Sequence, residues 1–102
     1  MKRIAILASG NGSNAENIVR YFSGNRSVDI VFICSNNPRA RVHERAARLG
    51  IPSMTFSNAD FADGTAVLKK LSEAAIDFIV LAGFMNKIPD VILQAYPERI
   101  LN

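Results

Sequence analysis

Hydrophobic residues recur along this chain with two different periods, and segments of the two kinds alternate. Short, nearly continuous apolar runs indicate β-strands that are covered on both faces. Between them, apolar residues recur every three or four positions, as they do on the buried face of an amphipathic helix. The apolar runs predict strands over residues 4–8, 28–34, 52–56 and 77–81, and residues 100–102 begin a fifth.

The first helix follows the first strand almost at once. Ser13 and Glu16 have the spacing of a capping box, which predicts Ser13 as the N-cap, and Gly24 is placed to close the helix. The predicted buried stripe of this helix consists of Ala15, Ile18, Val19 and Phe22.

Three more helices are predicted by the same criteria, over residues 40–49, from residue 63 through residue 75, and from Pro89 to before Pro97. Residues 57–62 are predicted as a loop, and the strand over residues 52–56 is expected near a sheet edge because Pro52 cannot donate a ladder hydrogen bond.

Strands and helices thus alternate four times and end in a fifth-strand stub. Such an order predicts a Rossmann-like α/β fold, with flanking helices and a mostly parallel sheet of order 3-2-1-4 plus the stub beside strand 4. Ligands bind such folds where the strand order reverses. Here that is between residues 9–14 and residues 82–87, and Asn102 is expected to emerge near the same crevice.

Composition limits the possible classes of protein. A chain of 102 residues is enough for one domain, and an apolar content of 49% argues against disorder. The longest apolar run, residues 76–85, is interrupted by Asp77 and too short to span a bilayer, so no membrane partner is expected. The N-terminus lacks a signal-peptide cleavage site, which favours a cytoplasmic location. Cys34, the only cysteine, is expected to be a buried, reduced thiol.

The net charge of +3 is not concentrated in a nucleic-acid-binding pattern. Arg41, Arg45 and Arg48 recur with the period of one helix face, and no aromatic residues lie among them. They are interpreted as a solvated helix face, and no nucleic-acid partner is expected.

Candidate chemistry begins at Gly10-Asn11-Gly12-Ser13-Asn14-Ala15, which satisfies the relaxed dinucleotide fingerprint G-x-G-x-x-A. A dinucleotide site also needs an acidic residue at the end of strand two, where residues 34–37 read Cys-Ser-Asn-Asn and Asp29 lies at the wrong end. The loop lacks the Gly-Lys-Ser/Thr ending of a triphosphate loop. A single phosphate monoester fits best, held by backbone N–H groups and by the side chains of Asn11, Ser13 and Asn14.

Three alternatives stay open at this point. Ser13 and Asn14 could simply cap the helix, and the domain could be a phosphate-ligand binding module without catalysis. A Rossmann-type dinucleotide-binding domain is the third.

Three motifs resemble phosphoribosylglycinamide formyltransferase, the folate-dependent enzyme family of purine synthesis. They are Ser9-Gly10-Asn11-Gly12-Ser13-Asn14, Leu81-Ala82-Gly83-Phe84-Met85 and Ile100-Leu101-Asn102, and they occur in the same order along the whole chain. Related folate formyl-transfer enzymes share the two later motifs but not the first.

The resemblance implies an enzyme that transfers a formyl group from 10-formyltetrahydrofolate to the amine of glycinamide ribonucleotide, with no metal. By position, Gly12, Ser13 and Asn14 would hold the substrate phosphate, and Gly83 would lie against the substrate. The stretch that lines the folate pocket, largely through backbone groups, would consist of Met85, Asn86, Lys87 and Ile88. Asn102 would bind near the formyl group and act as the catalytic residue, because an amide N–H aimed at the developing oxyanion contributes ~2.7–4 kcal/mol.

The chain departs from the family pattern in places. Asn86 stands where many bacterial members have arginine, and Gly64 aligns with an arginine that some members use near the folate. The family continues into a His-Pro segment whose histidine is the general acid/base, whereas His43, the only histidine here, lies among arginines and is not expected to be catalytic.

Residues 1–102 are therefore expected to be the N-terminal nucleotide-binding part of a truncated formyltransferase fold. The isolated chain is expected to be inactive and to self-associate through its incomplete sheet edge.

Overall fold

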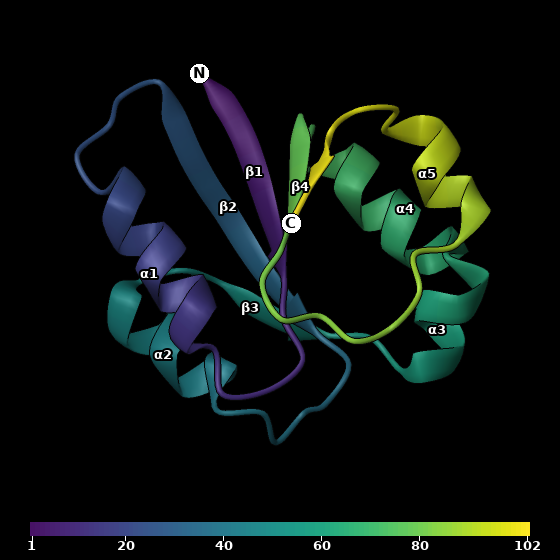
Figure 1. The fold of residues 1–102 in the computed structure, drawn as a ribbon, viewed down its shortest axis with the longest axis horizontal. Helices are drawn as coiled ribbons and strands as arrows, with labels where there is room; N and C mark the ends of the chain where they lie inside the picture. Colours follow the sequence, from purple (N-terminus) through teal and green to yellow (C-terminus); the bar gives the residue numbers. More distant parts are fainter.

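The computed structural model describes residues 1–102 as alternating strands and helices (Figure 1). The strands are β1 (Lys2–Leu7), β2 (Val28–Ser35), β3 (Ser53–Thr55), β4 (Phe78–Leu81) and β5 (Ile100–Leu101). The helices are α1 (Ser13–Phe22), α2 (Val42–Leu49), α3 (Asn58–Asp63), α4 (Thr65–Glu73) and α5 (Asp90–Ala95). None of the helices is long and apolar enough to cross a membrane.

The five strands form one parallel sheet of order β3-β2-β1-β4-β5, which confirms the predicted fold class and strand order. β3 lies at one edge, as the position of Pro52 predicts. β5 forms the other edge with only two residues, Ile100 opposite Ile79 and Leu101 opposite Val80. Self-association through that edge stays a prediction.

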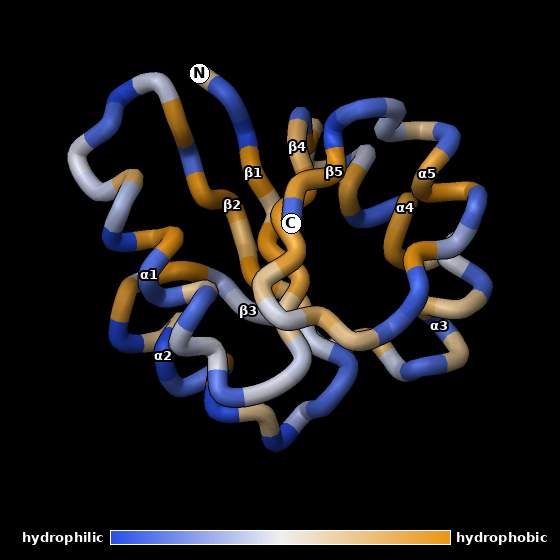
Figure 2. Tube along the Cα trace, in the orientation of Figure 1, coloured by the Kyte–Doolittle hydropathy of each residue, from blue (hydrophilic) through white to orange (hydrophobic).

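Helices cover both faces of the sheet (Figure 1). Successive residues of β1 point to opposite faces, and this alternation divides the core into two clusters. One lies under α1 and α2 and contains Ile4, Ile6 and Ala8; the other lies under α3, α4 and α5 and contains Ala5 and Leu7. Figure 2 shows hydrophobic strands in the centre of the fold and hydrophilic stretches along the outer helices and loops.

The predicted loop over residues 57–62 is wrong, because most of this segment forms α3. Ser57 Oγ accepts a hydrogen bond from the Asp60 backbone N–H at 3.0 Å, and the Asp60 carboxylate accepts one from the Ser57 N–H at 3.4 Å. This is a capping box that uses aspartate in place of glutamate. The following helix accordingly begins at Thr65, after Gly64, rather than at Asp63.

Two glycines end helices as predicted. Gly50 adopts φ 74° at the end of α2, and Gly24 adopts φ 81° just past α1. The second helix starts at Val42 rather than at residue 40, because residues 37–41 form turns after β2.

Candidate functional site at the carboxyl ends of β1 and β4

The first loop (residues 9–14) leaves β1 and enters α1 at Ser13. The predicted capping box is wrong here, since Gly12 is the N-cap, with φ 84°, and no side chain caps the helix. Glu16 cannot reach back to a cap because its carboxylate accepts hydrogen bonds from Arg20 and Arg45, each at 2.9 Å. The interpretation of Ser13 as a simple helix cap is therefore wrong too.

The first loop presents an uninterrupted row of free hydrogen-bond donors. The first helical bond of α1 runs from the Glu16 N–H to the Gly12 carbonyl, and no backbone N–H from residue 9 to residue 15 donates to a protein acceptor. The side chains of Ser13 and Asn14 are exposed and form no hydrogen bond within the chain. Such a row at a helix N-terminus, where the helix dipole is positive, suits an anion.

Helix α2 packs against the first loop and fixes its shape. A Cβ on Gly12 would lie 2.6 Å from Val42 Cβ and 2.7 Å from Val42 Cα, so only glycine fits there, and its positive φ requires glycine as well. The Val42 N–H donates to the Gly10 carbonyl at 3.3 Å. The loop is thus held by backbone contact with a neighbouring helix.

The interpretation of the α2 arginines as a solvated face is wrong for Arg45. Its Nε donates to the Asn11 carbonyl at 2.8 Å, its Nη2 to Asn11 Oδ1 at 2.7 Å, and its Nη1 to Glu16 Oε1 at 2.9 Å. Its side chain is 25% exposed, against 67% for Arg48 on the same helix. Arg45 therefore binds the first loop.

Glu16 is a carboxylate beside the first loop that binds the neighbouring arginines. Three guanidinium groups surround its carboxylate, with N–O distances of 2.8 Å for Arg20, 2.9 Å for Arg45 and 3.6 Å for Arg48. Hydrogen bonds from Arg45 and then Arg20 lower the pKa of Glu16 below its ordinary value. The negative charge next to the first loop is therefore matched by more than one positive charge.

The second loop (residues 82–87) follows β4 and lies against the first. The Ala82 N–H donates to the Leu7 carbonyl at 2.8 Å, and the Met85 N–H donates to Ser9 Oγ at 3.0 Å. Gly83 is exposed with φ 70°, and the Met85 side chain is 83% exposed. The predicted meeting of the two loops is confirmed by these contacts (Figure 1).

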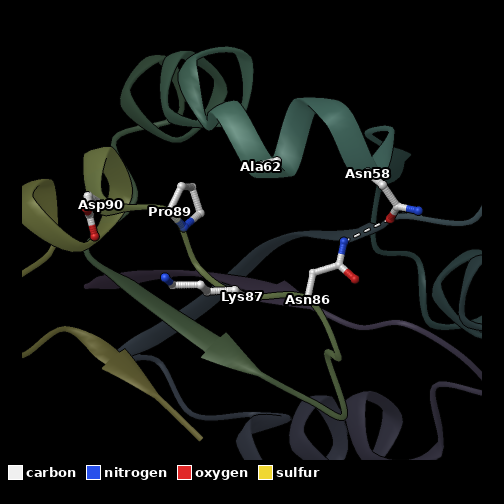
Figure 3. Close-up of a pocket in the computed structure, with 6 residues that line it drawn as sticks. All are labelled: Asn58, Ala62, Asn86, Lys87, Pro89 and Asp90. Carbon is white, nitrogen blue, oxygen red and sulfur yellow. Dashed lines mark hydrogen bonds between the residues drawn. The ribbon is translucent and has the colours of Figure 1, made fainter.

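A cavity of about 450 Å³ opens beside the end of the second loop (Figure 3). Its lining comes from α3, from the end of the second loop and from the start of α5: Asn58, Ala62, Asn86, Lys87, Pro89 and Asp90. Its volume lies in the range of small-molecule sites, about 300–1,000 Å³. Lys87 and Asp90 place one charge of each sign on its wall.

Two of the residues that are predicted to line the folate pocket, Asn86 and Ile88, have partners within the chain. Asn86 Nδ2 donates to Asn58 Oδ1 at 2.9 Å, the bond that is dashed in Figure 3. The same oxygen accepts from Asn36 Nδ2 at 2.9 Å, while Asn36 Oδ1 is buried without a partner. The Ile88 side chain is buried in the core cluster under α3 to α5, so only its backbone is available to a ligand.

A second cavity, of about 300 Å³, lies between α1 and the β4–β5 edge of the sheet. Most of its lining is apolar, and its amide residues are Asn14 and Asn102. Two residues that are 88 positions apart by number (102 − 14) thus line one cavity. The predicted approach of Asn102 to the crevice is confirmed by this arrangement.

Three other groups that could carry chemistry are engaged elsewhere in the fold. His43 is engaged between α2 and β3, with Nδ1 2.9 Å from Ser53 Oγ and Nε2 3.1 Å from Thr55 Oγ1. Cys34 is buried, and burial raises its pKa to about 12, so its thiol is not a nucleophile. Asp29 pairs with Arg3 at the other end of β2, at 3.4 Å, so no carboxylate stands where a dinucleotide ribose would need one.

Sequence reasoning did not identify Arg45, Asn58 or Asn36 as part of the site. Asn58 lies on the helix that was predicted as a loop, and Arg45 is 34 positions from Asn11. No local pattern marks either contact.

Comparison with known proteins identifies the family. The formyl transferase family model matches residues 2–102. The chain is 37% identical over 107 residues to phosphoribosylglycinamide formyltransferase of Bacillus subtilis, covering all of this chain and 55% of that protein.

Solved structures agree with the sequence comparison. The glycinamide ribonucleotide transformylase 1 of Geobacillus kaustophilus superposes with a TM-score of 0.89 at 37% identity, covering 98% of this chain and 56% of that one. The phosphoribosylglycinamide formyltransferase of Streptococcus pneumoniae gives 0.83 at 39% identity, covering 98% and 54%. The chain therefore spans about half the length of these relatives.

Proposed function

The chain belongs to the formyl transferase family, and on this premise we propose that it serves phosphoribosylglycinamide formyl transfer in de novo purine biosynthesis. The reaction moves a formyl group from 10-formyltetrahydrofolate to the amine of glycinamide ribonucleotide. Residues 1–102 supply the nucleotide-binding part of the formyltransferase domain and one wall of the folate site.

The observation that carries the proposal is the row of free donors in the first loop. The N–H groups of residues 12–14, the Ser13 hydroxyl and the Asn14 amide form no hydrogen bond to protein acceptors. The 5′-phosphate of glycinamide ribonucleotide accepts these hydrogen bonds, and the neighbouring arginines offset its charge. A dinucleotide is less suited to the site, because no carboxylate stands at the end of β2 to bind its ribose.

The cavity shared by Asn14 and Asn102 supports the next step of the proposal. A substrate whose phosphate is held by Ser13 and Asn14 extends along Gly83, where no side chain blocks it, toward Asn102. When the substrate amine attacks the formyl carbon, the carbonyl oxygen gains negative charge. The Asn102 amide donates a hydrogen bond to that oxygen, a contribution of ~2.7–4 kcal/mol to the transition state.

The residues beside the second loop fit a folate. Met85 exposes an apolar side chain, and the larger cavity holds Asn86 and Lys87. The bound folate supplies the formyl carbon. Met85 covers an apolar part of the donor, Asn86 and Ile88 contribute backbone groups, and Lys87 pairs with an anionic group.

The first experiment measures binding of glycinamide ribonucleotide to the chain by calorimetry. A hydrogen bond to a charged partner contributes about 1.5–3 kcal/mol, so Ser13→Ala and Asn14→Ala should each weaken binding by about tenfold or more. Asn17→Ala is the matched control, because Asn17 is exposed on the same helix and forms no hydrogen bond. Unchanged affinity in both loop variants would contradict the phosphate site.

The second experiment separates the proposed chemistry from binding alone. Formyl transfer from 10-formyltetrahydrofolate is assayed with this chain and with a chain of the length of its relatives. We expect turnover from the longer chain, and a tenfold or greater loss with Asn102→Ala. Binding of NAD(P) without binding of glycinamide ribonucleotide would favour the dinucleotide alternative. Phosphate binding without turnover by the longer chain would favour a non-catalytic binding module.

A further inference from the structure

We propose that Arg45 is the positioning residue of the first loop, and that it acts by fixing the carboxamide of Asn11 with its N–H₂ group toward the bound phosphate. The inference rests on the proposed function, because it assigns a task to a residue outside the loop that holds the anion. Neither the loop sequence nor the motifs of the chain point to Arg45.

The contact is a fork rather than a single bond. Nε donates to the Asn11 carbonyl at 2.8 Å, and both Nε and Nη2 donate to Asn11 Oδ1, at 3.2 and 2.7 Å. The planar guanidinium therefore binds the backbone and the side chain of one residue at the same time. This contact therefore fixes the rotamer of Asn11 and adds to the backbone contacts that hold the loop.

The chemistry of guanidinium settles which way the carboxamide points. Arginine has donors only, so the atom of Asn11 that faces Arg45 must be the oxygen. The Nδ2 group then lies on the other branch of the amide, and it donates to no protein acceptor. A donor is therefore presented to an anion, and the acceptor oxygen that would repel the anion is occupied.

Arg45 is itself held from its far side. Its Nη1 donates to Glu16 Oε1 at 2.9 Å, and the Glu16 side chain is only 13% exposed. The groups that face Arg45 are thus Asn11 and Glu16, and Arg20 and Arg48 bind the same carboxylate. α1 and α2 lie side by side (Figure 1). The Arg45 guanidinium on α2 thus connects Glu16 of α1 to Asn11 of the first loop.

Charge alone does not explain this arrangement. Arg48 carries the same charge on the same helix, 3.6 Å from the same carboxylate, and forms no hydrogen bond with Asn11. If Arg45 acted only as a positive charge, the two residues would be equivalent. The two arginines differ in that only Arg45 binds Asn11 with both arms of its guanidinium.

The test measures binding of ribose 5-phosphate to the chain by calorimetry. Arg45→Gln should weaken binding at least tenfold. Arg45→Lys, which keeps the charge but lacks the fork, should lose nearly as much, and Arg48→Gln should change affinity less than threefold. In an Asn11→Ala background the effect of Arg45→Gln should shrink, because the carboxamide that Arg45 orients is gone.

NMR chemical shifts of the Asn11 side-chain amide report the orientation of Asn11, which a change in fold stability alone would not alter. In the wild type we expect one resolved pair of Nδ2 protons that shifts when ribose 5-phosphate binds. In Arg45→Lys both proton shifts should move to the values of a freely rotating asparagine side chain and should respond less to ribose 5-phosphate, while circular dichroism shows an intact fold. Retained affinity and an unchanged Asn11 amide in Arg45→Lys would overturn the inference.

The outcomes distinguish this inference from the proposed function. If ribose 5-phosphate binds as described but glycinamide ribonucleotide binds no better, the proposed function fails and the role of Arg45 stands. If the wild type binds no phosphate ester, the proposed function fails and so does this inference. If phosphate binds and Arg45→Gln has no effect, only the inference fails.

Discussion

The two loops that meet at the carboxyl ends of β1 and β4 are built in opposite ways. The first loop is held from outside, by Val42 and Arg45 of α2, and its own donor groups are left free. The second loop is held through its own side chains, because Asn86 bonds Asn58 and Phe84 packs against the buried Phe61. The groups of the second loop that a ligand can still contact are its backbone, the exposed Met85 side chain and the residues that line the larger cavity.

This difference indicates two kinds of recognition. Free, preorganised donors suit a small ligand group of fixed charge and geometry, such as a phosphate. A cavity with few free polar side chains suits a larger ligand that is recognised by shape and by backbone contacts. The proposed substrate and the proposed donor correspond to these two classes. Changes to the donor groups of the first loop should therefore leave folate binding unaffected, and changes to the wall of the larger cavity should leave phosphate binding unaffected.

The largest effect is expected on the side of the second loop, with Phe61→Ala. Phe61 is buried, with its ring centroid 4.8 Å from that of Phe84 in the second loop and 5.9 Å from that of Phe56. Truncation of a buried phenylalanine costs about 3–5 kcal/mol, which urea unfolding measures. The folded fraction should still bind ribose 5-phosphate as the wild type does.

Tyr21→Ala serves as the control, because Tyr21 is an exposed aromatic residue and its loss should change stability by less than about 0.5 kcal/mol. Loss of phosphate affinity in folded Phe61→Ala would show that the two loops are not independent.

The next effect lies in the first loop, with Gly12→Ala. An L-residue with φ 84° costs about 1–2 kcal/mol, and the new Cβ would meet the Cα and Cβ of Val42. Overpacking adds about 1–3 kcal/mol, so a loss of about 2 kcal/mol or more is expected in urea unfolding, together with weaker phosphate binding.

Substitutions of two other glycines, Gly64 and Gly10, serve as comparisons for Gly12→Ala. At Gly64, φ is also positive, and a Cβ there would lie 2.6 Å from Val91 Cγ1 and 2.7 Å from Pro89 Cγ, a ring atom fixed to the backbone, so Gly64→Ala should also lower stability but should leave phosphate binding unchanged. Gly10 has no atom within 4 Å of a built Cβ, so Gly10→Ala should be close to neutral in stability. Equal costs at Gly10 and Gly12 would mean that α2 does not hold the loop.

A smaller effect is expected for Asn58→Ala, which removes the acceptor shared by Asn36 and Asn86. A hydrogen bond contributes about 0.5–1.5 kcal/mol, so the variant should lose about 1 kcal/mol and free the Asn86 side chain. Folate binding should change while ribose 5-phosphate binding stays within twofold. Asn58→Asp keeps acceptor oxygens and should restore most of the stability; failure to do so would contradict the shared-acceptor role.

The smallest effect is a difference in acid sensitivity at Glu16. Its pKa is lowered in the folded state from an ordinary value of 4.5, so its contribution to stability is complete above that value and is lost as the pH falls through the folded pKa. Between pH 5 and pH 3 the wild type should therefore lose more stability than Glu16→Gln, as followed by urea unfolding at each pH. Glu44→Gln is the control, because Glu44 forms no ion pair.

The fold could be predicted from the sequence because its signals are local. The alternation of Ile4 and Ile6 with Ala5 and Leu7 fixes two faces, and the order of elements fixes the topology. The meeting of the first and second loops with Asn102 follows from parallel strands ending at one edge.

The parts that could not be predicted depend on contacts between distant residues. Glu16 has the spacing of a capping-box residue, but Arg45 from α2 takes its carboxylate, and the sequence near Glu16 does not contain that information. α3 was missed because its capping box uses Asp60 where glutamate or glutamine is the usual signal. Asn58, and with it the wall of the larger cavity, was missed for the same reason.

The most direct test of the account is an NMR titration of the ¹⁵N-labelled chain with each proposed ligand separately. Glycinamide ribonucleotide should shift the backbone amides of residues 10–15 and the side-chain amides of Asn14 and Asn102. A folate should instead shift the amides of residues 84–88 and the side-chain amide of Asn86. Shifts of residues 10–15 by the folate, or shifts of residues 10–15 by NAD(P) but not by glycinamide ribonucleotide, would contradict the division of the site into a phosphate loop and a folate wall.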